Sequence, residues 1–460
     1  MQATLPERRK KPIPIEFQVY FEKGNKLAAT NPDEAEKYYA MACKLCPEIW
    51  LGIGCEEVKA KHFGIAALRL QQVIEFATDD KTKAAALTNY GMIVQQMSKR
   101  SDSEPYFRES MRLWKRADTA TDLALCRLYA GDLKEAESLI NWALRKEPVN
   151  HAIWFNKALI SLLRGDLVRG FLEYEARWKN PQSKTKKLPV LRPEWNGESL
   201  QGKTLLVYAE QGAGDTIQML RYGPLLKQKG CRLLLAPQPG LSALAARQGC
   251  WDAIHEDIIG RIERGDVPQY DLQIPAMSLP RLFGTTLDTI PTAPYLEAGK
   301  SHVEQRGNLR VGFSWAGSVD HAHDLWRSTH LSDWKPLFEL PGIDWFSFQI
   351  GPRTIDMIGL TLPINDLSDQ IHTYDDTATF VSQMDLIICV DTSLAHLAGA
   401  LGKECWVLLP SAPDWRWMLD REDSPWYPSI KLVRQKQELD WVEVFERVKD
   451  ALIKRNGCQA

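Results

Sequence analysis

Residues 386–403 read LIICVDTSLAHLAGALGK, and this stretch decides how the second half of the chain folds. The five apolar residues that open it are typical of a strand buried on both faces of a sheet. Asp391, Thr392 and Ser393 follow, and their side chains favour the start of a helix. The stretch therefore predicts a strand that runs directly into a helix, whose first N–H groups and positive dipole end suit a phosphate.

The same texture extends from Lys203 to the end of the chain, where short β-rich runs alternate with helical stretches. The predicted strands are residues 204–208, 232–235, 271–274, 309–314, 345–349, 386–390 and 405–409. This alternation predicts parallel sheets covered by helices on both faces. A polar connection at residues 297–308 divides the strands into two sets, so we expect two Rossmann-like lobes with a ligand between them. The amphipathic residues 441–454 are expected to form a helix that returns to the first lobe.

The first part of the chain has a helical period instead. Small residues recur there at intervals of 32 to 36 residues, close to the tetratricopeptide repeat of about 34 residues. They are Ala35, Ala67, Ser103, Ala136 and Gly170. This pattern predicts an all-α, tetratricopeptide-like solenoid whose concave side binds peptide, with a plain spacer as the alternative.

The predicted domain order follows from these two patterns. Residues 1–15 form an N-terminal tail, residues 16–180 the repeats, and residues 181–202 a linker interrupted by proline and glycine. Residues 203–303 form the first lobe, on the acceptor side, and residues 304–460 form the second.

The composition limits which partners and which cellular compartment we expect for this protein. A net charge of -2 and 44% hydrophobic residues are typical of a globular protein, and the short basic clusters at 8–11 and 184–187 do not favour nucleic acid, without excluding it. The nine cysteines lack the spacing of a disulfide framework, and we interpret the Cys43–Cys46 C-x-x-C as buried thiols rather than a zinc or redox site. Neither an export signal nor a membrane span is found, so a cytoplasmic location is expected.

A second glycine-containing turn follows the first predicted strand, where residues 210–217 read EQGAGDTI. Gly212 and Gly214 let the backbone turn tightly and approach a ligand. Asp215 is either a helix-capping acid or a catalytic base. A dinucleotide fingerprint fits poorly, because Ile217 occupies the third glycine position and no acidic residue follows the second strand.

Taken together, these segments resemble the heptosyltransferase-like, family 9-like group of GT-B glycosyltransferases, and specifically the bacterial proteins that join tetratricopeptide repeats to such a domain. The resemblance covers residues 203–456. Its motifs are the Gly-Ala-Gly-Asp loop at 212–215, the Val-Asp-Thr-Ser turn at 390–393 with His396, and the runs PDWRW at 413–417 and DREDSPWY at 420–427.

The resemblance implies a metal-independent transfer of a hexosyl, heptosyl or pentosyl group from a nucleotide diphosphate sugar to a hydroxyl acceptor, with no other cofactor. Asp215 would be the general base, and Arg327 the cation that offsets the charge of the leaving group. The implied donor-binding residues are Gly212, Gly214, Asp391, Thr392, Ser393, Leu394, His396 and Arg416. A protein acceptor selected by the repeats is favoured over lipopolysaccharide, polysaccharide or modified DNA, and a repeat scaffold with an inactive GT-B domain is a further alternative.

From the sequence alone, several residues have two possible roles. His396 is either a ligand contact or a packed helix histidine, and Arg327 is either catalytic or a surface residue. Trp415 and Trp417 either stack on the donor or pack the lobe interface. His321, His323 and His330 indicate a lid over the donor rather than a metal site. The sugar, the base and the stereochemical outcome are not identified by the sequence.

Overall fold

The computed structural model describes residues 13–456, apart from 184, 186, 190, 300–306 and 322. The predicted basic tail at 8–11 therefore lies outside the described residues, as does most of the predicted connection at 297–308. The chain divides into two compact units between Asn156 and Lys157.

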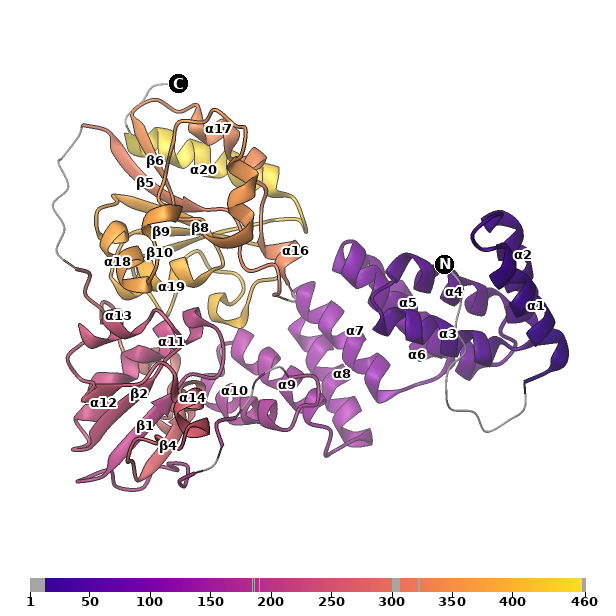
Figure 1. The fold of residues 1–460 in the computed structure, drawn as a ribbon, viewed down its shortest axis with the longest axis horizontal. Helices are drawn as coiled ribbons and strands as arrows, with labels where there is room; N and C mark the ends of the chain where they lie inside the picture. Colours follow the sequence, from indigo (N-terminus) through magenta and orange to yellow (C-terminus); the bar gives the residue numbers. More distant parts are fainter. Residues whose placement is uncertain are drawn as a thin grey trace. The chain divides into compact units, whose positions relative to one another are not determined.

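The first unit consists of helical hairpins, as the tetratricopeptide-like period predicts (Figure 1). Each odd-numbered helix from α1 to α7 packs against the helix that follows it, and α5 also packs against a short 3-10 turn. Successive hairpins contact one another. The elements are α1 (Ile15–Leu27), α2 (Pro32–Leu45), α3 (Pro47–Lys59), α4 (Phe63–Phe76), α5 (Asp80–Met97), η1 (Arg100–Ser103), α6 (Glu104–Leu113), α7 (Ala117–Tyr129) and α8 (Leu133–Lys146).

Local chemistry explains where these helices begin and meet. The side chain of Asp132 accepts the N–H of Glu135 and caps α8, and Gly131 before it has a φ of 81°, which glycine adopts without strain. The repeated Ala35 and Ala136 are buried, whereas Ala67 is half-buried. At the repeated Gly170 a Cβ would lie 2.5 Å from the side chain of Leu162, so that position has no room for one.

The two cysteines of the C-x-x-C are buried, as the sequence indicates. Cys43 and Cys46 lie in the same core cluster as Trp50, among other apolar side chains. Burial raises the pKa of the Cys43 thiol to about 12, so the thiol stays protonated and behaves as a small apolar group.

The last helical hairpin belongs to the second compact unit, although its sequence period continues that of the repeats. The unit begins within α9 (His151–Leu163) and continues through α10 (Leu167–Tyr174) and η2 (Glu175–Trp178). Phe171 of α10 packs edge-on against Trp415 and Trp426, with ring centroids 5.4 and 6.5 Å away. These buried contacts tie α10 to the α/β part of the chain, which is why the boundary lies earlier than the proline-rich residues 181–202.

The first lobe of the second unit is a four-stranded parallel sheet of order β3-β2-β1-β4. Its strands are β1 (Thr204–Tyr208), β2 (Arg232–Ala236), β3 (Ala253–Ile254) and β4 (Leu272–Pro275). Its helices are α11 (Ala213–Met219), α12 (Gly223–Lys227), α13 (Ser242–Ala246), α14 (Ile258–Glu263) and α15 (Leu279–Leu282), with short 3-10 turns η3 (Leu220–Tyr222), η4 (Ala276–Ser278) and η5 (Leu287–Thr289). The three predicted strands are confirmed within a residue, and β3 is too short to leave a sequence pattern.

The second lobe is a six-stranded parallel sheet of order β10-β9-β8-β5-β6-β7. Its strands are β5 (Leu309–Ser314), β6 (Ile343–Ser347), β7 (Ile364–Asp366), β8 (Leu386–Val390), β9 (Cys405–Leu409) and β10 (Ile430–Arg434). The helices are α16 (Asp324–Arg327), α17 (Lys335–Phe338), α18 (Tyr374–Ser382), α19 (Ser393–Ala400) and α20 (Trp441–Asn456), and η6 (Leu331–Trp334), η7 (Gly351–Met357), η8 (Ser368–Gln370) and η9 (Trp415–Trp417) are 3-10 turns. The unpredicted β7 and β10 are edge strands, and β7 is largely exposed.

One expectation for this lobe is wrong. Helix α20 does not return to the first lobe but packs against α17 and β10 of its own lobe. Val444 and Phe445 lie in the same buried cluster as Phe313 of β5. The apolar stripe of α20 therefore completes the core of the second lobe instead of bridging the two.

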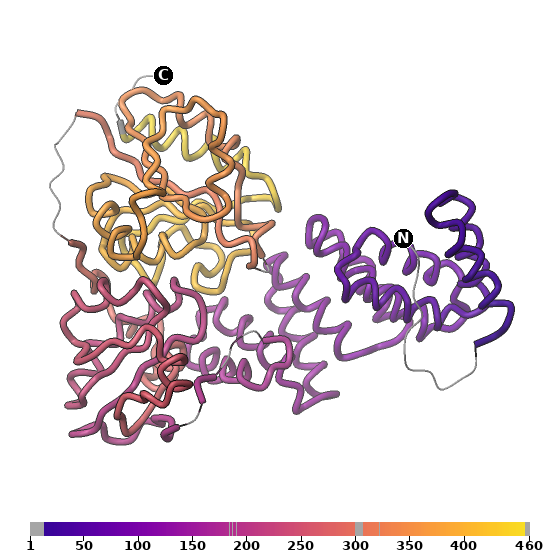
Figure 2. Tube along the Cα trace, in the orientation of Figure 1, coloured from indigo at the N-terminus to yellow at the C-terminus, as the bar shows by residue number. Residues whose placement is uncertain are grey.

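The two lobes are successive stretches of the chain, magenta to rose for the first and orange to yellow for the second (Figure 2). In the second sheet, β5 lies between β6 and β8, so the connections leave in opposite directions from the neighbouring strands β5 and β8. The carboxyl ends of such neighbours leave a crevice in which open α/β sheets bind ligands. The turns after β1 and β8 are the glycine-rich and Asp-Thr-Ser segments singled out in the sequence.

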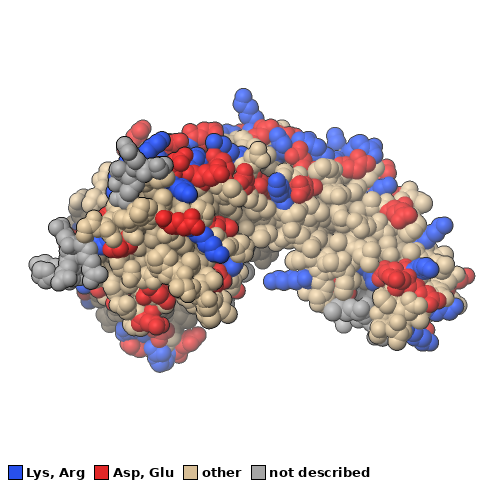
Figure 3. Space-filling model, turned by 90° about the horizontal axis from the view of Figure 1, so that it is seen from above, with Lys and Arg blue, Asp and Glu red and all other residues tan. Residues whose placement is uncertain are grey.

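The surface charge is mixed. On the face of the molecule drawn in Figure 3, acidic and basic side chains are mixed along the margins, wide areas carry neither, and no broad basic area is seen. None of the helices in the described part of the chain is long and apolar enough to cross a lipid bilayer.

Candidate functional site

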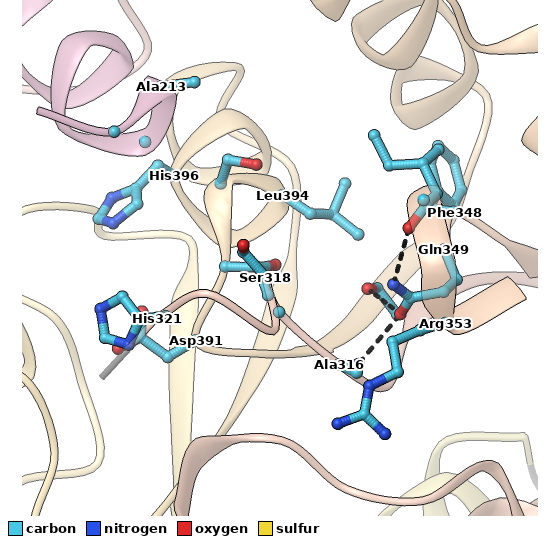
Figure 4. A pocket seen from close by; sticks show the side chains of 18 of the residues that line it. Ala213, Ala316, Ser318, His321, Phe348, Gln349, Arg353, Asp391, Leu394 and His396 are labelled. Carbon is cyan, nitrogen blue, oxygen red and sulfur yellow. Dashed lines mark hydrogen bonds between the residues drawn. The ribbon is translucent and has the colours of Figure 1, made fainter. Parts of the chain in front are cut away.

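A cavity of about 520 Å³ lies within the second unit and is lined by residues of both lobes (Figure 4). Cavities of this size accommodate small-molecule ligands. All the residues that the sequence predicts to be catalytic or donor-binding line it, namely Gly212, Gly214, Asp215, Arg327, Asp391, Thr392, Ser393, Leu394, His396 and Arg416. The fold therefore brings together, at one cavity, residues that the sequence separates by up to about 200 positions.

Asp215 serves as a helix cap and also faces the cavity. Its Oδ2 accepts the backbone N–H of Gly212 at 2.8 Å, which caps the start of α11. Its Oδ1 forms an ion pair with Nη2 of Arg416 from the second lobe. Burial raises the pKa of Asp215 and the charge of Arg416 partly offsets this, while 22% of the side chain stays exposed. A carboxylate with a raised pKa that opens onto a cavity is chemically suited to accept a proton.

The two glycines of this turn have different physical roles. Gly212 has a φ of -70°, so its backbone conformation is open to any residue. A Cβ on Gly214 would lie 2.8 Å from Cδ2 of His396 and 3.4 Å from Cα of Ser393. Gly214 is therefore needed because α11 and α19 approach closely across the two lobes, and the tight turn expected from the sequence is not the reason for it.

The N-terminus of α19 is open, in contrast to that of α11. Thr392 is the N-cap residue, and among the described residues its side chain makes no capping hydrogen bond to the first turn of the helix. Thr392 Oγ1 is also buried without a hydrogen-bond partner in the described structure. Ser393 and Leu394 both line the cavity, so the uncapped first turn opens onto it. An uncapped helix N-terminus that lines a cavity suits an anionic group.

His396 is a packed and neutral histidine at the cavity wall. Its ring stacks on Trp417 with centroids 5.4 Å apart, and its Nδ1 lies 3.0 Å from the hydroxyl of Tyr427. Burial, with a contribution from the nearby charge of Arg416, lowers the pKa of His396 to about 3. His396 can therefore contact a ligand in the cavity through its ring and its second ring nitrogen, but it brings no positive charge.

Arg416 links the two lobes through its whole guanidinium group. Its Nε donates to Oε1 of Gln218 at 2.7 Å, its Nη1 donates to Oδ1 of Asp414 at 2.7 Å, and its Nη2 binds Asp215. The guanidinium also lies over the Trp415 ring, 4.2 Å from its centroid. Burial would raise the pKa of Asp414, but the charge of Arg416 outweighs it and lowers that pKa. Arg416 is thus fully engaged within the protein.

Arg327 lies beside the open turn of α19. Its Nη1 donates to the backbone oxygen of Asp391 at 3.0 Å, and 15% of its side chain is exposed. A Cβ on Gly317 would lie 2.2 Å from Nη2 of Arg327, so the guanidinium passes directly over the backbone of that glycine. This glycine lets Arg327 reach the cavity from the loop after β5.

Arg353 is a third arginine at the cavity, beside Arg327 and Arg416, and the sequence did not indicate it. Its Nη2 donates to Oδ2 of Asp324 at 3.3 Å, and Oδ1 of Asp324 lies 3.5 Å from Nε of Arg327. The buried Asp324 therefore lies between the two arginines. The feature of the sequence that could have indicated Arg353 is its position two residues after Gly351, in the turn that follows β6.

Asp391 is the acid of the second lobe with the most strongly raised pKa. Burial and the nearby charge of Asp414 raise its pKa to about 6, against the opposing charge of Arg327. A carboxyl group with this pKa changes charge just below neutral pH.

Other cavity residues hold its walls in place. Gln349 accepts hydrogen bonds from the hydroxyl of Ser314 and the N–H of Ala316, both at 3.0 Å (Figure 4). Tyr374 donates from its hydroxyl to Oγ of Ser393 at 3.1 Å. These residues come from separate strands and helices, so no local motif indicates them.

The histidine-rich loop is placed only in part at the cavity. His321 lines it, and burial with the charge of Arg327 lowers the pKa of His321 to about 4. His323 lies beside His321 with ring centroids 5.7 Å apart. Within the described ranges, His, Cys, Asp and Glu side chains do not gather in groups of three or more that could hold a metal ion.

Comparisons with known proteins give the following likenesses. No family model matches the chain. The chain is 26% identical over 414 residues to Protein FlbA of Caulobacter vibrioides, covering 83% of this chain and 69% of that protein. A glycosyl transferase family 9 structure from Veillonella parvula is 12% identical, with a TM-score of 0.41 over 55% of this chain and 91% of its own. YrrB, described as a TPR protein with an unusual peptide-binding site, is 13% identical, with a TM-score of 0.27 over 36% of this chain and 91% of its own.

The elements and sheet orders of the chain itself show an array of helical hairpins with a tetratricopeptide-like period, followed by an α/β unit of two Rossmann-like lobes.

Proposed function

We propose that the protein is a GT-B glycosyltransferase, which moves a sugar from a nucleotide diphosphate sugar to a hydroxyl acceptor. One observation supports this above the others. The uncapped N-terminus of α19 and two arginines line the same cavity that Asp215 enters from the opposite lobe. A site for a diphosphate and a carboxylate for an incoming hydroxyl are the two features that such a transfer requires.

The donor side of the proposed site consists of backbone and arginine. The first turn of α19, with Thr392 and Ser393, binds the diphosphate through N–H and hydroxyl groups. Arg327 and Arg353 supply positive charge to the phosphate oxygens as the leaving group gains negative charge. We propose that these cations serve in place of a metal ion, and chelation with EDTA should leave the rate unchanged.

The acceptor side is built around Asp215. The acceptor hydroxyl oxygen attacks the anomeric carbon while the bond from that carbon to the diphosphate oxygen breaks. The hydroxyl proton passes to the Asp215 carboxylate, and the nucleoside diphosphate leaves with both electrons of the broken bond. Arg416 keeps Asp215 oriented toward the cavity during this step.

We further propose that the acceptor is a protein and that the repeat array selects it, in the cytoplasm. Extended peptides are a common ligand of stacked helical hairpins. The cysteines within the described residues are all free, which agrees with a reducing compartment. The mixed surface charge seen in Figure 3 gives no support to a DNA acceptor.

Donor binding can be tested by thermal unfolding in the presence of ADP-, UDP- and GDP-sugars. A ligand at about one hundred times its Kd stabilises the folded protein by about 2.7 kcal/mol, so one donor class should raise the Tm clearly. NAD serves as the negative control. A protein stabilised by none of the nucleotide sugars would be an assembly scaffold rather than a transferase.

The acceptor can be tested by intact-mass analysis of proteins purified from cells with and without an active enzyme. A mass increase of one glycosyl residue on a protein would identify both sugar class and acceptor. If mass changes occur only on lipopolysaccharide or polysaccharide, the proposed protein acceptor is wrong while the transferase activity stands.

A further inference from the structure

A buried ion pair joins the last helical hairpin of the repeat pattern to the loop between β1 and α11, which leads to Asp215. Arg177 of η2 has a fully buried side chain, and its Nη2 lies 3.1 Å from Oε1 of Glu210, which is also fully buried. Glu210 follows β1 and is five residues before Asp215. The pair therefore connects the end of the repeats with the loop that positions the proposed base.

Hydrogen bonds and aromatic rings surround the guanidinium group of Arg177 and fix its position. Its Nη2 also donates to Oγ of Ser278 at 2.8 Å, and its Nη1 donates to Oε1 of Glu175 at 2.9 Å. The guanidinium carbon lies 5.0 Å from the centroid of the Tyr174 ring and 4.3 Å from that of Trp178. A cation enclosed in this way keeps a fixed geometry because every neighbour restricts it.

A neighbouring contact reaches the same loop. The hydroxyl of Tyr174, the last residue of α10, exchanges hydrogen bonds with the side-chain amide of Gln211 at 2.9 and 3.2 Å. Gln211 directly precedes Gly212, whose N–H binds Asp215. In the second lobe, Phe171 of α10 packs against Trp415, which is adjacent to Arg416. The hairpin thus contacts both segments that carry the Asp215–Arg416 pair.

We propose that the last hairpin, α9–α10–η2, is a positioning element of the transferase and that the Arg177–Glu210 pair acts through it to set the orientation of Asp215. This inference rests on the proposed function and adds residues outside the cavity to it. Arg177 and Glu210 do not line the cavity, so they are positioning residues and not catalytic ones.

The buried carboxylate of Glu210 depends on the positive charge of Arg177 because few other groups donate hydrogen bonds to it. Its Oε1 also accepts the N–H of Met277 at 3.2 Å, and its Oε2 is buried without a hydrogen-bond partner in the described structure. Burial raises the pKa of Glu210 to about 7 even with Arg177 beside it. The other charged and titratable groups that face this pair are Glu175 and Tyr174 from the hairpin, Tyr208 and Asp215 from β1 and its loop, and Arg281 beside Glu175.

Removal of the cation should therefore disturb the loop in a pH-dependent way. In Arg177→Met the side chain can still pack between the rings, but ionised Glu210 is left buried without its cation. The pKa of Glu210 then rises further, so the loop is disturbed more as pH increases above about 7 and less below it. We expect kcat to fall by about 10- to 100-fold near pH 8, with a smaller loss near pH 6 and little change in the donor KM.

The test compares four full-length proteins. They are wild type, Arg177→Met, the double variant Arg177→Met with Glu210→Gln, and Arg169→Met. The double variant removes the buried charge and should recover most of the lost kcat with a flat pH dependence of the loss. Arg169 pairs with Glu173 on the same helix at 2.9 Å with 45% of its side chain exposed, so Arg169→Met should keep the wild-type rate.

Hydrogen–deuterium exchange of residues 209–219 provides a readout that needs no turnover. Faster exchange of this segment is expected in Arg177→Met but not in Arg169→Met, and the double variant should restore protection. A lower Tm in Arg177→Met with unchanged exchange, kcat and pH profile would mean that the pair is merely structural and would overturn the proposal. If wild type shows no transfer at all, the exchange comparison still decides whether the hairpin sets the loop, while the proposed function falls separately.

Discussion

Asp215 and Arg416, 201 positions apart in the chain, form an ion pair that joins the two lobes at the wall of the cavity. The pair places a carboxylate from the first lobe beside a cation from the second, within reach of any ligand held between them. Arg416 also binds Asp414, so the guanidinium would keep a partner if Asp215 were changed.

Asp215→Asn should abolish transfer without unfolding the protein. An amide cannot accept the acceptor proton, so kcat is expected to fall by at least about 100-fold. The Asn side chain can still accept the N–H of Gly212, and we expect the loss of stability to remain below about 3 kcal/mol because Arg416 keeps Asp414. Product formation by mass spectrometry and chemical unfolding measure the two effects.

Asp257→Asn is the matched control for that variant, because Asp257 caps α14 of the same lobe by accepting the N–H of Gly260 outside the cavity. It should lose only capping stability and keep its rate. A normal turnover in Asp215→Asn would remove Asp215 from the mechanism.

Gly317→Ala should lower activity with little effect on stability. The new Cβ would overlap the guanidinium of Arg327, and the flexible end of that side chain can move away at little energetic expense. Displaced from the turn of α19, Arg327 can no longer contact the diphosphate, and kcat should fall by about 10-fold or more. Gly307→Ala is the control, because a Cβ there meets no atom within 4 Å. Equal rates for the two variants would argue against the role of Arg327.

Donor affinity should weaken as pH rises through about 6. Asp391, whose pKa is raised to about 6, is protonated below that pH and can donate a hydrogen bond, whereas above it the carboxylate repels a diphosphate. A nucleotide sugar is the proper probe, since its two phosphates keep a fixed charge over this range. We expect Kd to rise severalfold between about pH 5 and pH 7.5 in wild type, and to stay level in Asp391→Asn. Titration calorimetry at each pH gives the comparison, and a flat wild-type profile would place Asp391 away from the phosphates.

Gly214→Ala should destabilise the second unit. Its Cβ would lie 2.8 Å from the ring of His396, and that ring is fixed by its stack on Trp417 and its hydrogen bond to Tyr427. Overpacking of this kind costs about 1–3 kcal/mol, measured by chemical unfolding. Adding His396→Ala to Gly214→Ala should relieve the clash, so that the double variant is more stable than the sum of the single changes predicts. Strict additivity would show that the two positions are not in contact.

The architecture followed from the sequence where the signal was local. Strands such as β1, β5, β8 and β9 are continuous apolar runs, and their bounds were predicted to the residue. The small residues of the repeats and the βα turns at Asp215 and Asp391 were likewise visible, because each depends on residues a few positions apart. The edge strands β7 and β10 were missed, since β7 is largely exposed and the charged Lys431 and Arg434 interrupt the apolar run of β10.

Long-range relationships were decided only by tertiary packing. The sequence could name Arg416 as a donor-binding residue, but only the fold shows that its guanidinium is occupied by Asp215, Asp414 and Gln218. It could name His396, but only burial beside Arg416 makes that histidine neutral. Periodicity assigned Arg177 to the repeats, whereas packing attaches it to Glu210. Local propensity acts over a few residues, while charge pairing, burial and close approach depend on which segments the fold brings together.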